Sequence, residues 1–455
     1  MFSKEKKYGI IGLARSGIAA AYKIKSLGGQ AYLSDIKSEK EIPESEQLKA
    51  DFPCEFSGHT DKLLNCDEWI VSPGIPLTAP IIIKGREHNI KMISELEFGF
   101  QIKNPHSKLI AVTGSNGKST TASLIAHIIE QCGHICVLAG NIGDAFCGFP
   151  IEKEEIEFIV LEVSSFQLEL IDTFRPDLAL LLNITPDHLN RYDTFSDYAK
   201  AKFNIFRNQT SSDFAILNLD DPLIREQSEF IRANKRFFTL KPYSYTEIIP
   251  SAWLKDDCLY SVLTDTEYPL REMQLRGPHN WANAMASILA CETIGISNSI
   301  VKSGLESFTP LKHRLQFVRT INGISFYNDS KATNTDSVKY ALLSFEQPIR
   351  IIMGGSEKGE DFEVLTDLLA QHAKKAYLTG ATAQKMASVW SGKIPLEIID
   401  DFEECIRKAF SEATAGDKIV LSPACASYDK FRNFEQRGDT FIDIVNKMAK
   451  EYEKA

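Results

Sequence analysis

Short apolar runs recur along the whole chain, and most are followed by a stretch in which apolar residues have helical spacing. The clearest runs cover residues 7–11, 30–33, 69–71, 109–112, 157–163, 177–185, 324–329, 349–353, 376–380 and 418–421. Apolar runs of this length, bounded by glycine or polar residues, are typical of strands buried on both faces of a parallel sheet. The pattern therefore predicts an α/β fold with mostly parallel sheets.

The spacing of these runs also indicates how the chain is divided. A helix is predicted over residues 93–104, and the short polar linker after it places a boundary near residue 100. Residues 235–275 contain shorter β-like segments, which we interpret as an extension of the central sheet. At about 150 residues per domain, a chain of 455 residues favours about three domains. The predicted domains are residues 1–98, 99–310 and 311–455.

Residues 110–121, Ile-Ala-Val-Thr-Gly-Ser-Asn-Gly-Lys-Ser-Thr-Thr, have the form of a strand, a glycine turn and a helix. Gly114 and Gly117 allow a sharp turn that directs backbone N–H groups toward phosphates, and the helix N-terminus favours negative charge. Lys118 would contact the β and γ phosphates of a nucleotide. Val112 stands where the usual eight-residue phosphate loop has its first glycine, so a turn that merely starts a helix is the alternative.

Polar residues also follow the next two apolar runs. Glu162 lies at the exit of one run, and His188 comes just after the other. Because parallel strands end at one edge of a sheet, Lys118, Glu162 and His188 should converge on one crevice. Glu162 and the Ser119 hydroxyl are natural Mg²⁺ ligands there. On its own, Glu162 could equally cap a helix, and a lone loop histidine is usually a surface group.

Residues 7–35 predict a strand, a glycine turn, a helix and a second strand that ends at Asp35, as in dinucleotide-binding folds. The turn, residues 12–17, departs from the NAD fingerprint at Ala14, whose methyl group hinders close approach of a pyrophosphate. We therefore expect another nucleotide, with Asp35 near its polar groups. An NAD-dependent oxidoreductase and a tight turn without a ligand are the alternatives.

The predicted third sheet carries cations and hydroxyls at its strand ends but no second phosphate loop. Lys331, Lys358 and Arg437 are the cations, and they favour a site for a small carboxylate-bearing molecule. The alternative is charge scattered over loops. Before this sheet, His279 and Asn280 open a predicted helix and could reach a nucleotide, although simple N-terminal capping explains them as well.

The composition, with 44% hydrophobic and 25% charged residues, is that of an ordinary globular protein. The net charge of −10 disfavours nucleic acid as a partner, so small-molecule substrates are expected. No apolar run approaches about 18 residues, and we expect neither a signal peptide nor a membrane span. The nine cysteines lack paired metal spacing, which favours reduced thiols in the cytoplasm.

As a set, these motifs resemble those of the Mur ligases, the ATP-dependent amide-forming enzymes of peptidoglycan precursor synthesis. The resemblance covers essentially the whole chain. Besides the turn at 12–17 and the phosphate loop, it rests on Leu-Glu-Val-Ser-Ser-Phe-Gln-Leu-Glu at 161–169, Asn-Ile-Thr-Pro-Asp-His-Leu-Asn-Arg-Tyr at 183–192, Asn-Asp-Ser-Lys-Ala-Thr-Asn at 328–334 and Ser-Pro-Ala-Cys-Ala-Ser-Tyr-Asp-Lys-Phe-Arg-Asn-Phe-Glu-Gln-Arg-Gly at 422–438. The last two motifs discriminate, because relatives that add diaminopimelate or lysine would show an Asp-Asn-Pro-Arg motif, which this sequence lacks. Folylpolyglutamate synthetases share the phosphate loop but lack a comparable first domain.

The resemblance implies a Rossmann-like N-terminal domain for the UDP end of a substrate, a central phosphate-loop ATPase domain and a Rossmann-like C-terminal domain for an amino acid. It implies a cytoplasmic, monomeric enzyme that uses ATP to add D-glutamate to UDP-N-acetylmuramoyl-L-alanine through an acyl phosphate. ATP and two Mg²⁺ ions are expected, and Lys202 would carry a carbamate. A carbamate is an anion that can bind Mg²⁺, whereas the lysine ammonium would repel it.

The resemblance also implies roles for individual residues. Catalysis would depend on Lys118, His188 and Lys202, and the metal ligands would be Ser119, Glu162, His188 and Lys202. The residues expected to bind ATP are Gly114, Ser115, Asn116, Gly117, Lys118, Ser119, Thr120, Asn280, Arg314 and Asp329. Those expected to bind the UDP substrate are Arg15, Ser16, Asp35, Lys37, Ser72, Gly74, Asn141 and His188. Those expected to bind D-glutamate are Thr333, Lys358, Ser427 and Phe434.

Two features depart from the family pattern. Ala14 stands where glycine is more usual, and relatives differ around Ser356 and Glu357 in the placement of an aspartate. A sibling ligase that adds another amino acid and a nucleotide-gated binding protein without catalysis are further alternatives.

Overall fold

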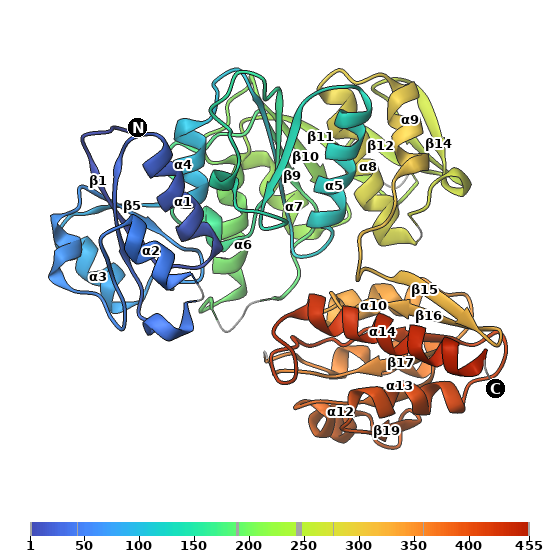
Figure 1. Ribbon diagram of the computed structural model, residues 1–455. Helices are drawn as coiled ribbons and strands as arrows, with labels where there is room; N and C mark the ends of the chain where they lie inside the picture. The colour runs from blue at the N-terminus through green and yellow to red at the C-terminus, as the bar shows by residue number, and fades with distance from the viewer. Residues whose placement is uncertain are drawn as a thin grey trace. The chain divides into compact units, whose positions relative to one another are not determined.

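The computed structural model describes residues 2–42, 44–187, 191–242, 248–275, 277–357 and 359–453. The predictions for His188 and Lys358 lie outside the described residues. The described strands form three sheets, each from its own stretch of the chain (Figure 1). By internal contacts the chain divides into two units, of which the first contains the first two sheets and the second contains the third. The α/β class with mostly parallel strands is confirmed, whereas the predicted domain boundaries stay predictions.

The first sheet has five parallel strands in the order β3-β2-β1-β4-β5. The strands are β1 Lys7–Ile11, β2 Gln30–Ser34, β3 Cys54–Glu55, β4 Glu68–Val71 and β5 Lys91–Ser94, and the helices are α1 Arg15–Ser26, α2 Ser45–Asp51, α3 Pro80–Glu87 and α4 Glu95–Ile102. Successive residues of a strand point to opposite faces, and in β1 Ile10 belongs to one apolar core and Ile11 to the other. Both faces of this central strand are therefore buried.

The helix predicted over residues 93–104 begins later than expected. Strand β5 occupies the first part of that range, where Ile93 pairs with β4, and α4 begins only at Glu95. The Ser94 hydroxyl accepts a hydrogen bond from the Glu97 N–H at 3.2 Å and so caps the helix. The helix is present, but its predicted start was wrong because a strand of four residues gives little alternation to detect beside a strongly apolar helix.

The second sheet has nine strands in the order β14-β13-β12-β11-β10-β9-β6-β8-β7. All neighbouring pairs are parallel except β12–β13 and β13–β14, which are antiparallel and form one edge of the sheet. The strands are β6 Lys108–Thr113, β7 Cys136–Gly140, β8 Phe158–Glu162, β9 Leu178–Leu181, β10 Phe214–Asn218, β11 Asn234–Thr239, β12 Ala252–Lys255, β13 Cys258–Ser261 and β14 Thr266–Pro269. The helices are α5 Lys118–Gln131, α6 Phe195–Phe203, α7 Pro222–Gln227, α8 Pro278–Thr293 and α9 Asn298–Ser307. The β-like segments of residues 235–275 do extend the central sheet, as predicted.

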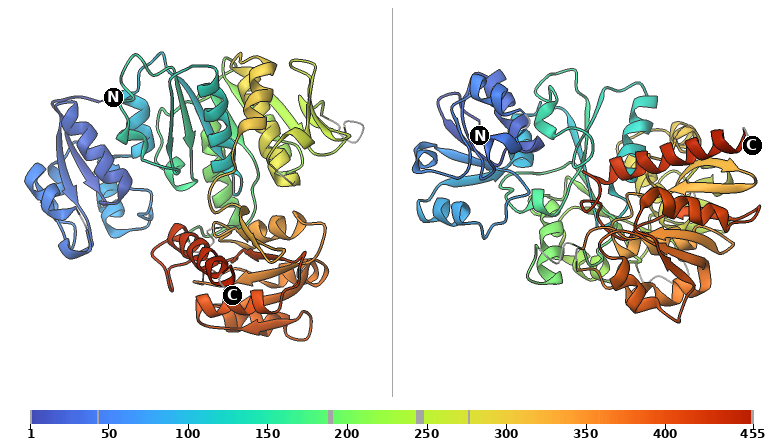
Figure 2. Two further views of the ribbon diagram at one scale, coloured as in Figure 1. Left: turned by 45° about the vertical axis from the view of Figure 1, so that its right-hand side comes forward. Right: turned by 60° about the horizontal axis from the view of Figure 1, so that its bottom comes forward.

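The third sheet has six strands in the order β15-β16-β20-β17-β18-β19, and only the β15–β16 pair is antiparallel. The strands are β15 Gln316–Ile321, β16 Ile324–Asn328, β17 Ile349–Met353, β18 Ala373–Leu378, β19 Leu396–Ile398 and β20 Lys418–Leu421, and the helices are α10 Thr335–Leu343, α11 Thr366–His372, α12 Ala383–Trp390, α13 Phe402–Ser411 and α14 Phe434–Tyr452. Helices α10 to α12 pack against one face, and α13 and α14 against the other (Figure 2). This is the doubly covered parallel sheet that the sequence predicted.

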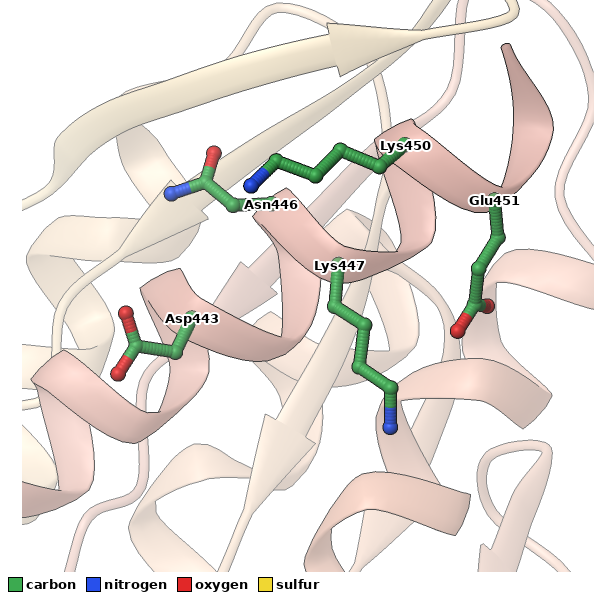
Figure 3. A pocket seen from close by; sticks show the side chains of 5 residues that line it. All are labelled: Asp443, Asn446, Lys447, Lys450 and Glu451. Atoms are coloured by element: carbon green, nitrogen blue, oxygen red, sulfur yellow. The ribbon is translucent and has the colours of Figure 1, made fainter. Parts of the chain in front are cut away.

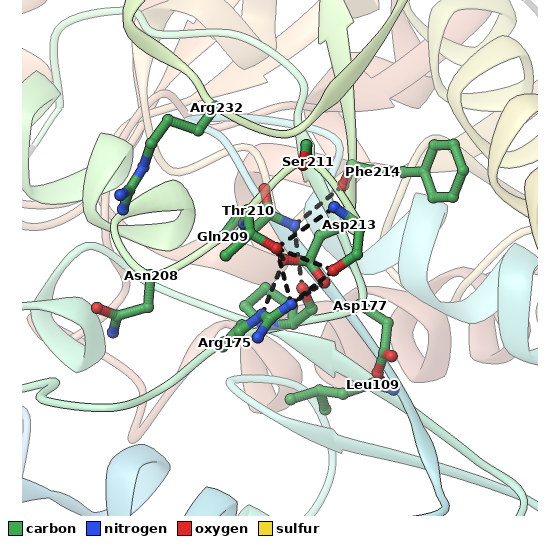
Figure 4. Close-up of polar contacts among 12 residues, drawn as sticks. Leu109, Arg175, Asp177, Asn208, Gln209, Thr210, Ser211, Asp213, Phe214 and Arg232 are labelled. Atoms are coloured by element: carbon green, nitrogen blue, oxygen red, sulfur yellow. Dashed lines mark hydrogen bonds and ion pairs between the residues drawn. The ribbon is translucent and has the colours of Figure 1, made fainter.

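The dense polar cluster in Figure 4 lies at the amino ends of β9 and β10, opposite the edge that carries the phosphate loop. Arg175 contacts Asp213 through Nε at 2.8 Å and Nη2 at 3.1 Å, and its Nη2 also donates to the Thr210 hydroxyl at 2.9 Å. Asp177 accepts a hydrogen bond from the Leu109 N–H at 2.8 Å. These contacts join the starts of three strands, so we assign the cluster to stability.

Two further observations concern membrane-spanning helices and cysteines. No helix among the described residues combines the length and the apolar character needed to cross a membrane. All nine cysteines are free thiols.

Candidate functional site

The phosphate-loop residues lie between the end of β6 and the start of α5, as predicted. Gly117 has a φ angle of 85°, a conformation that residues with a side chain rarely adopt. The space there is also closed, since a methyl group on Gly117 would lie 2.2 Å from Oδ1 of Asn283 on α8. Only glycine fits this point of the turn, and the helix N-terminus that follows favours an anionic ligand.

Asn183, just beyond β9, holds the middle of the loop. Its Oδ1 accepts a hydrogen bond from the Asn116 N–H at 2.8 Å, and its Nδ2 donates to the Asn116 carbonyl at 3.0 Å. The Asn183 carbonyl in turn accepts a hydrogen bond from the Ser115 N–H at 2.9 Å. These reciprocal bonds fix the loop conformation without a ligand.

Helix α6 holds the loop from another side. The hydroxyls of Tyr198 and Ser115 are hydrogen-bonded at 3.0 Å, and Nζ of Lys202 donates to the Gly114 carbonyl at 2.8 Å. Lys202 is only 2% exposed, and its Nζ lies 4.6 Å from the centre of the Tyr198 ring. Tyr198 and Lys202 are one helical turn apart, so both lie on the side of α6 that faces the phosphate loop.

Lys118 is the first residue of α5, and its side chain folds back over the loop. Its Nζ donates to the Gly114 carbonyl at 2.9 Å and to the Ser115 carbonyl at 2.8 Å. The next two residues, Ser119 and Thr120, are buried. The Lys118 ammonium thus lies at the carbonyls of its own loop. Because the side chain is flexible, it can reach a bound phosphate from there.

Glu162 ends β8, and β8 and β9 are the two parallel neighbours of β6. The three strand ends therefore lie side by side, as predicted. Glu162 is 2% exposed, and its Oε1 accepts a hydrogen bond from Nδ2 of Asn141 at 2.9 Å. This carboxylate and the Ser119 hydroxyl are hard oxygen donors that suit Mg²⁺. In the described part of the chain, which omits His188, no three His, Cys, Asp or Glu side chains are grouped to hold a metal.

A second group of predicted residues gathers at the carboxyl edge of the first sheet. Beyond β2, Oδ2 of Asp35 accepts a hydrogen bond from the Leu13 N–H at 2.6 Å, and Oδ1 accepts one from the Lys37 N–H at 2.8 Å. Beyond β4, the Ser72 hydroxyl donates to the Gly12 carbonyl at 2.6 Å. Asp35 and Ser72 thus hold the glycine turn after β1.

Three more residues predicted for the UDP substrate lie close to the same turn. Arg15 and Ser16 begin α1, and Gly74 follows β4. The Gly74 carbonyl accepts a hydrogen bond from Nη1 of Arg191 at 3.1 Å. A methyl group on Gly17 would lie 2.0 Å from the Gly12 carbonyl oxygen, so α1 packs directly on the turn. The carboxyl edge of the first sheet is therefore compact, and contacts within the protein already fix its conformation.

In the second unit, Asp329 follows β16 and is partly buried. Its Oδ1 accepts a hydrogen bond from the Leu315 N–H at 3.1 Å, and its Oδ2 accepts one from the Ser422 hydroxyl at 2.8 Å. Burial raises the pKa of Asp329 to about 7, although these two hydrogen bonds oppose the shift. Near neutral pH this carboxyl therefore exchanges between its charged and neutral forms.

Asn280 lies in the first turn of α8, beside His279. Burial, assisted by the positive charge of Arg314, lowers the pKa of His279 to about 4. The His279 ring lies 5.0 Å from the ring of Tyr340. The start of α8 therefore presents a neutral imidazole packed on an aromatic ring, and the predicted ATP contacts Asn280 and Arg314 lie near it.

Replacing Asp329 by asparagine should make the stability of the protein less dependent on pH. Between the ordinary pKa of 3.8 and about 7, the unfolded chain has lost this proton and the folded chain keeps it, so stability falls as pH rises. The raised pKa lowers the free energy of unfolding by at most about 4 kcal/mol, and partial exposure of the side chain reduces this value. Asparagine does not titrate. Calorimetry should therefore show that the Tm of D329N minus that of wild type increases by several degrees between about pH 5 and about pH 8.

Asp417→Asn is the matched control. Hydrogen bonds from Lys374 and Arg350 lower the pKa of Asp417, although burial opposes them. A lowered carboxyl pKa adds stability above the ordinary value, and that stability is fully present from about pH 5 to about pH 8. D417N should therefore destabilise the protein equally at both pH values, and the same flat response from D329N would contradict the raised pKa of Asp329.

Two loops of the second unit are joined to helix α14 by the buried side chain of Arg437. Its guanidinium donates to the Ser330 hydroxyl at 3.0 Å and carbonyl at 2.8 Å, and to the carbonyls of Cys425 at 3.0 Å and Ala426 at 3.2 Å. Arg437 therefore fixes the loops instead of contacting a ligand, which corrects the expectation from sequence. Of the residues predicted to bind D-glutamate, Thr333 and Ser427 lie in these loops, and Phe434 begins α14.

A depression of about 460 Å³ lies along α14 (Figure 3). Its lining residues are Asp443, Asn446, Lys447, Lys450 and Glu451. Two of them are already paired, Lys447 with Glu403 and Glu451 with Arg407. None was singled out from the sequence, and we interpret this surface as an ordinary charged helix face.

Asn183 and Asn283 were not identified as functional candidates from the sequence. Both contact the phosphate loop, although they come from segments about 67 and 166 residues away along the chain. For Asn283 a signal existed, because it lies three residues after Asn280 on one side of α8. For Asn183 a signal existed as well, because it opens the motif at 183–192.

Three family models match successive parts of the chain. Residues 6–94 match the Mur ligase MurD-like N-terminal domain, residues 112–291 match the Mur ligase middle domain, and residues 313–425 match the Mur ligase glutamate ligase domain. Among solved structures, the UDP-N-acetylmuramate-alanine ligase MurC of Thermotoga maritima has a TM-score of 0.63 at 18% identity, covering 98% of this chain and all of that one. At this identity the likeness supports the fold alone.

Relatives closer in sequence extend over nearly the whole chain. The UDP-N-acetylmuramoylalanine–D-glutamate ligase of Koribacter versatilis is 36% identical over 457 residues, covering 99% of both chains. The ligase of the same name from Geobacillus kaustophilus is 38% identical over 454 residues, covering 98% of this chain and 99% of its own. A Mur ligase family model matches the sequence that forms each of the three sheets, and the relatives match over nearly the whole chain. The chain therefore belongs to the Mur ligase family.

Proposed function

We propose that this protein is an ATP-dependent ligase that adds D-glutamate to UDP-N-acetylmuramoyl-L-alanine. The observation that carries the proposal is the near-full-length similarity to ligases named for this reaction. The preformed phosphate loop with Lys118 supports the use of ATP. The residues that discriminate among Mur ligases, in the stretches 328–334 and 422–438, lie in the second unit around Arg437.

The proposed reaction has two steps. The terminal alanyl carboxylate attacks the γ-phosphorus of ATP, which gives an acyl phosphate and ADP. The D-glutamate amine then attacks the acyl carbon, a tetrahedral intermediate forms, and phosphate leaves as the amide is made. Lys118 and the N–H groups of its loop would stabilise the charge that develops on the phosphoryl oxygens.

The sites are proposed from the family pattern and from the contacts above. The phosphate loop would bind ATP together with Asn280, Arg314 and Asp329. Mg²⁺, when bound, would neutralise phosphate charge, and Ser119, Glu162, His188 and a carbamylated Lys202 would hold it. The edge of the first sheet and Asn141 would receive the UDP substrate, and Thr333, Lys358, Ser427 and Phe434 would receive D-glutamate. A monomer located in the cytoplasm, with domains 1–98, 99–310 and 311–455, stays part of this proposal.

The test is release of ADP from ATP in the presence of UDP-N-acetylmuramoyl-L-alanine. D-glutamate should support release, and L-glutamate should support it at less than about 1% of that rate, because a site that orients the amine for attack tolerates only one configuration. Release with another amino acid instead would identify a sibling ligase and reject the proposal. Absence of release with every amino acid, together with tight ATP binding, would favour a binding protein without catalysis.

A further inference from the structure

Arg15 connects the turn after β1 to a loop of the central sheet. Its guanidinium donates to the carbonyls of Gly143, Gly140 and Asn141, and the distances from Nη2 to the last two are 3.3 and 3.4 Å. The N–H groups of arginine form a rigid planar fork. Three carbonyls on one fork therefore fix both the position and the orientation of this loop.

The same loop lies directly against Glu162. The Asn141 N–H donates to the Glu162 carbonyl at 2.9 Å, and Nδ2 of Asn141 donates to the Glu162 side chain. A methyl group on Gly140 would lie 2.4 Å from the Glu162 carbonyl oxygen. A shift of this loop would therefore move the Asn141 amide away from the carboxylate.

Two glycines give this loop conformational freedom. Gly140 and Gly143 both have positive φ angles, of 104° and 60°, and Asn141 is exposed. Glycine-rich loops have many accessible conformations and gain the most order from an external contact. Arg15 supplies that contact from the first sheet.

We propose that Arg15 is a positioning residue for the divalent-cation site at Glu162. By holding residues 140–143, it keeps the Asn141 amide on the Glu162 carboxylate, so that the second oxygen is directed toward the cation. This inference rests on the proposed function, in which Glu162 is a Mg²⁺ ligand. It also links the turn proposed to receive the UDP end of the substrate to the cation site.

Direct binding of Mn²⁺, followed by electron paramagnetic resonance in the presence of a non-hydrolysable ATP analogue, tests the proposal. Residues that orient a metal ligand typically contribute about 10- to 100-fold to metal affinity. Arg15→Met should therefore raise the Kd for Mn²⁺ at least about 10-fold, and Arg15→Lys, which keeps the charge but has a single donor nitrogen, should give a smaller increase. Hydrogen exchange at residues 140–143 should become faster in Arg15→Met.

Lys23→Met is the matched control, because Lys23 also lies on α1 and its Nζ donates to the Phe149 carbonyl at 2.7 Å and to Glu152 at 2.9 Å. It removes a cation from the same helix without touching residues 140–143, so Mn²⁺ affinity should stay at the wild-type value. Asn141→Ala should weaken Mn²⁺ binding like Arg15→Met, and the double variant should lose no more than either alone.

Additive losses in the double variant, or wild-type Mn²⁺ affinity in a folded Arg15→Met protein, would overturn the proposal. If Arg15→Met raised only the KM for UDP-N-acetylmuramoyl-L-alanine, Arg15 would be a direct substrate contact. Failure of the wild-type protein to release ADP with D-glutamate would reject the proposed function instead, and the Mn²⁺ comparison would still decide the role of Arg15.

Discussion

Replacing Lys118 by alanine should reduce ADP release at least about 10³-fold while the UDP substrate still binds. The lysine is the one side chain of the phosphate loop that can follow the transferred phosphoryl group, and removing a group that stabilises developing charge costs about 10²- to 10³-fold or more. Those residues proposed for the UDP substrate that lie at the first sheet do not contact Lys118 in any hydrogen bond described above. Calorimetric titration with UDP-N-acetylmuramoyl-L-alanine should therefore give a Kd within about 3-fold of wild type.

The loop itself should survive the substitution. Lys118 contributes two hydrogen bonds to carbonyls of its own loop, worth about 1–2 kcal/mol together. Asn183, Tyr198 and Lys202 still hold the loop from outside. Lys108→Ala, at the other end of β6 in an exposed pair with Asp177 at 3.4 Å, is the control and should leave the rate unchanged. A Lys118→Ala enzyme with more than about a tenth of the wild-type rate would remove the basis for the proposed phosphoryl transfer.

Local sequence signals predicted the parts of the fold that depend on neighbouring residues. The strand, turn and helix around Gly114 and Gly117 could be located because glycine spacing and apolar periodicity act within about a dozen residues. The long apolar runs were recognised as buried strands for the same reason. Strand β5 was missed because its four residues carry too little pattern beside the apolar helix α4.

The sequence was less informative about what each polar side chain contacts. Arg437 was expected to face a carboxylate ligand, and in the structure its N–H groups are occupied by oxygens of Ser330 and of residues 425–426. Asp35 was expected near a nucleotide, and its two oxygens accept backbone N–H groups of the glycine turn. Such partners come from distant segments, so only the assembled fold reveals whether a polar residue orients a loop or is left to meet a ligand.

Replacing Lys202 by alanine should strongly reduce turnover, and small carboxylic acids should restore part of it. Lys202 is 2% exposed, so its loss leaves a buried space beside Tyr198 and the Gly114 carbonyl. Under the carbamate proposal, this position supplies an anion to Mg²⁺. Formate or acetate can enter such a space and supply the missing carboxylate. ADP release should fall about 10²- to 10³-fold in the variant and recover at least about 10-fold with millimolar acid.

The structural and the chemical roles of Lys202 can be separated. Methylammonium would restore a cation that donates to the Gly114 carbonyl, whereas formate would restore an anion, so rescue by formate alone supports the carbamate. Lys200→Ala, on the same helix and 75% exposed beside Asp197, is the matched control and should neither lose activity nor respond to acid. Rescue by methylammonium and not by formate would mean that Lys202 acts as an ammonium that braces the phosphate loop, and the carbamate would then be rejected.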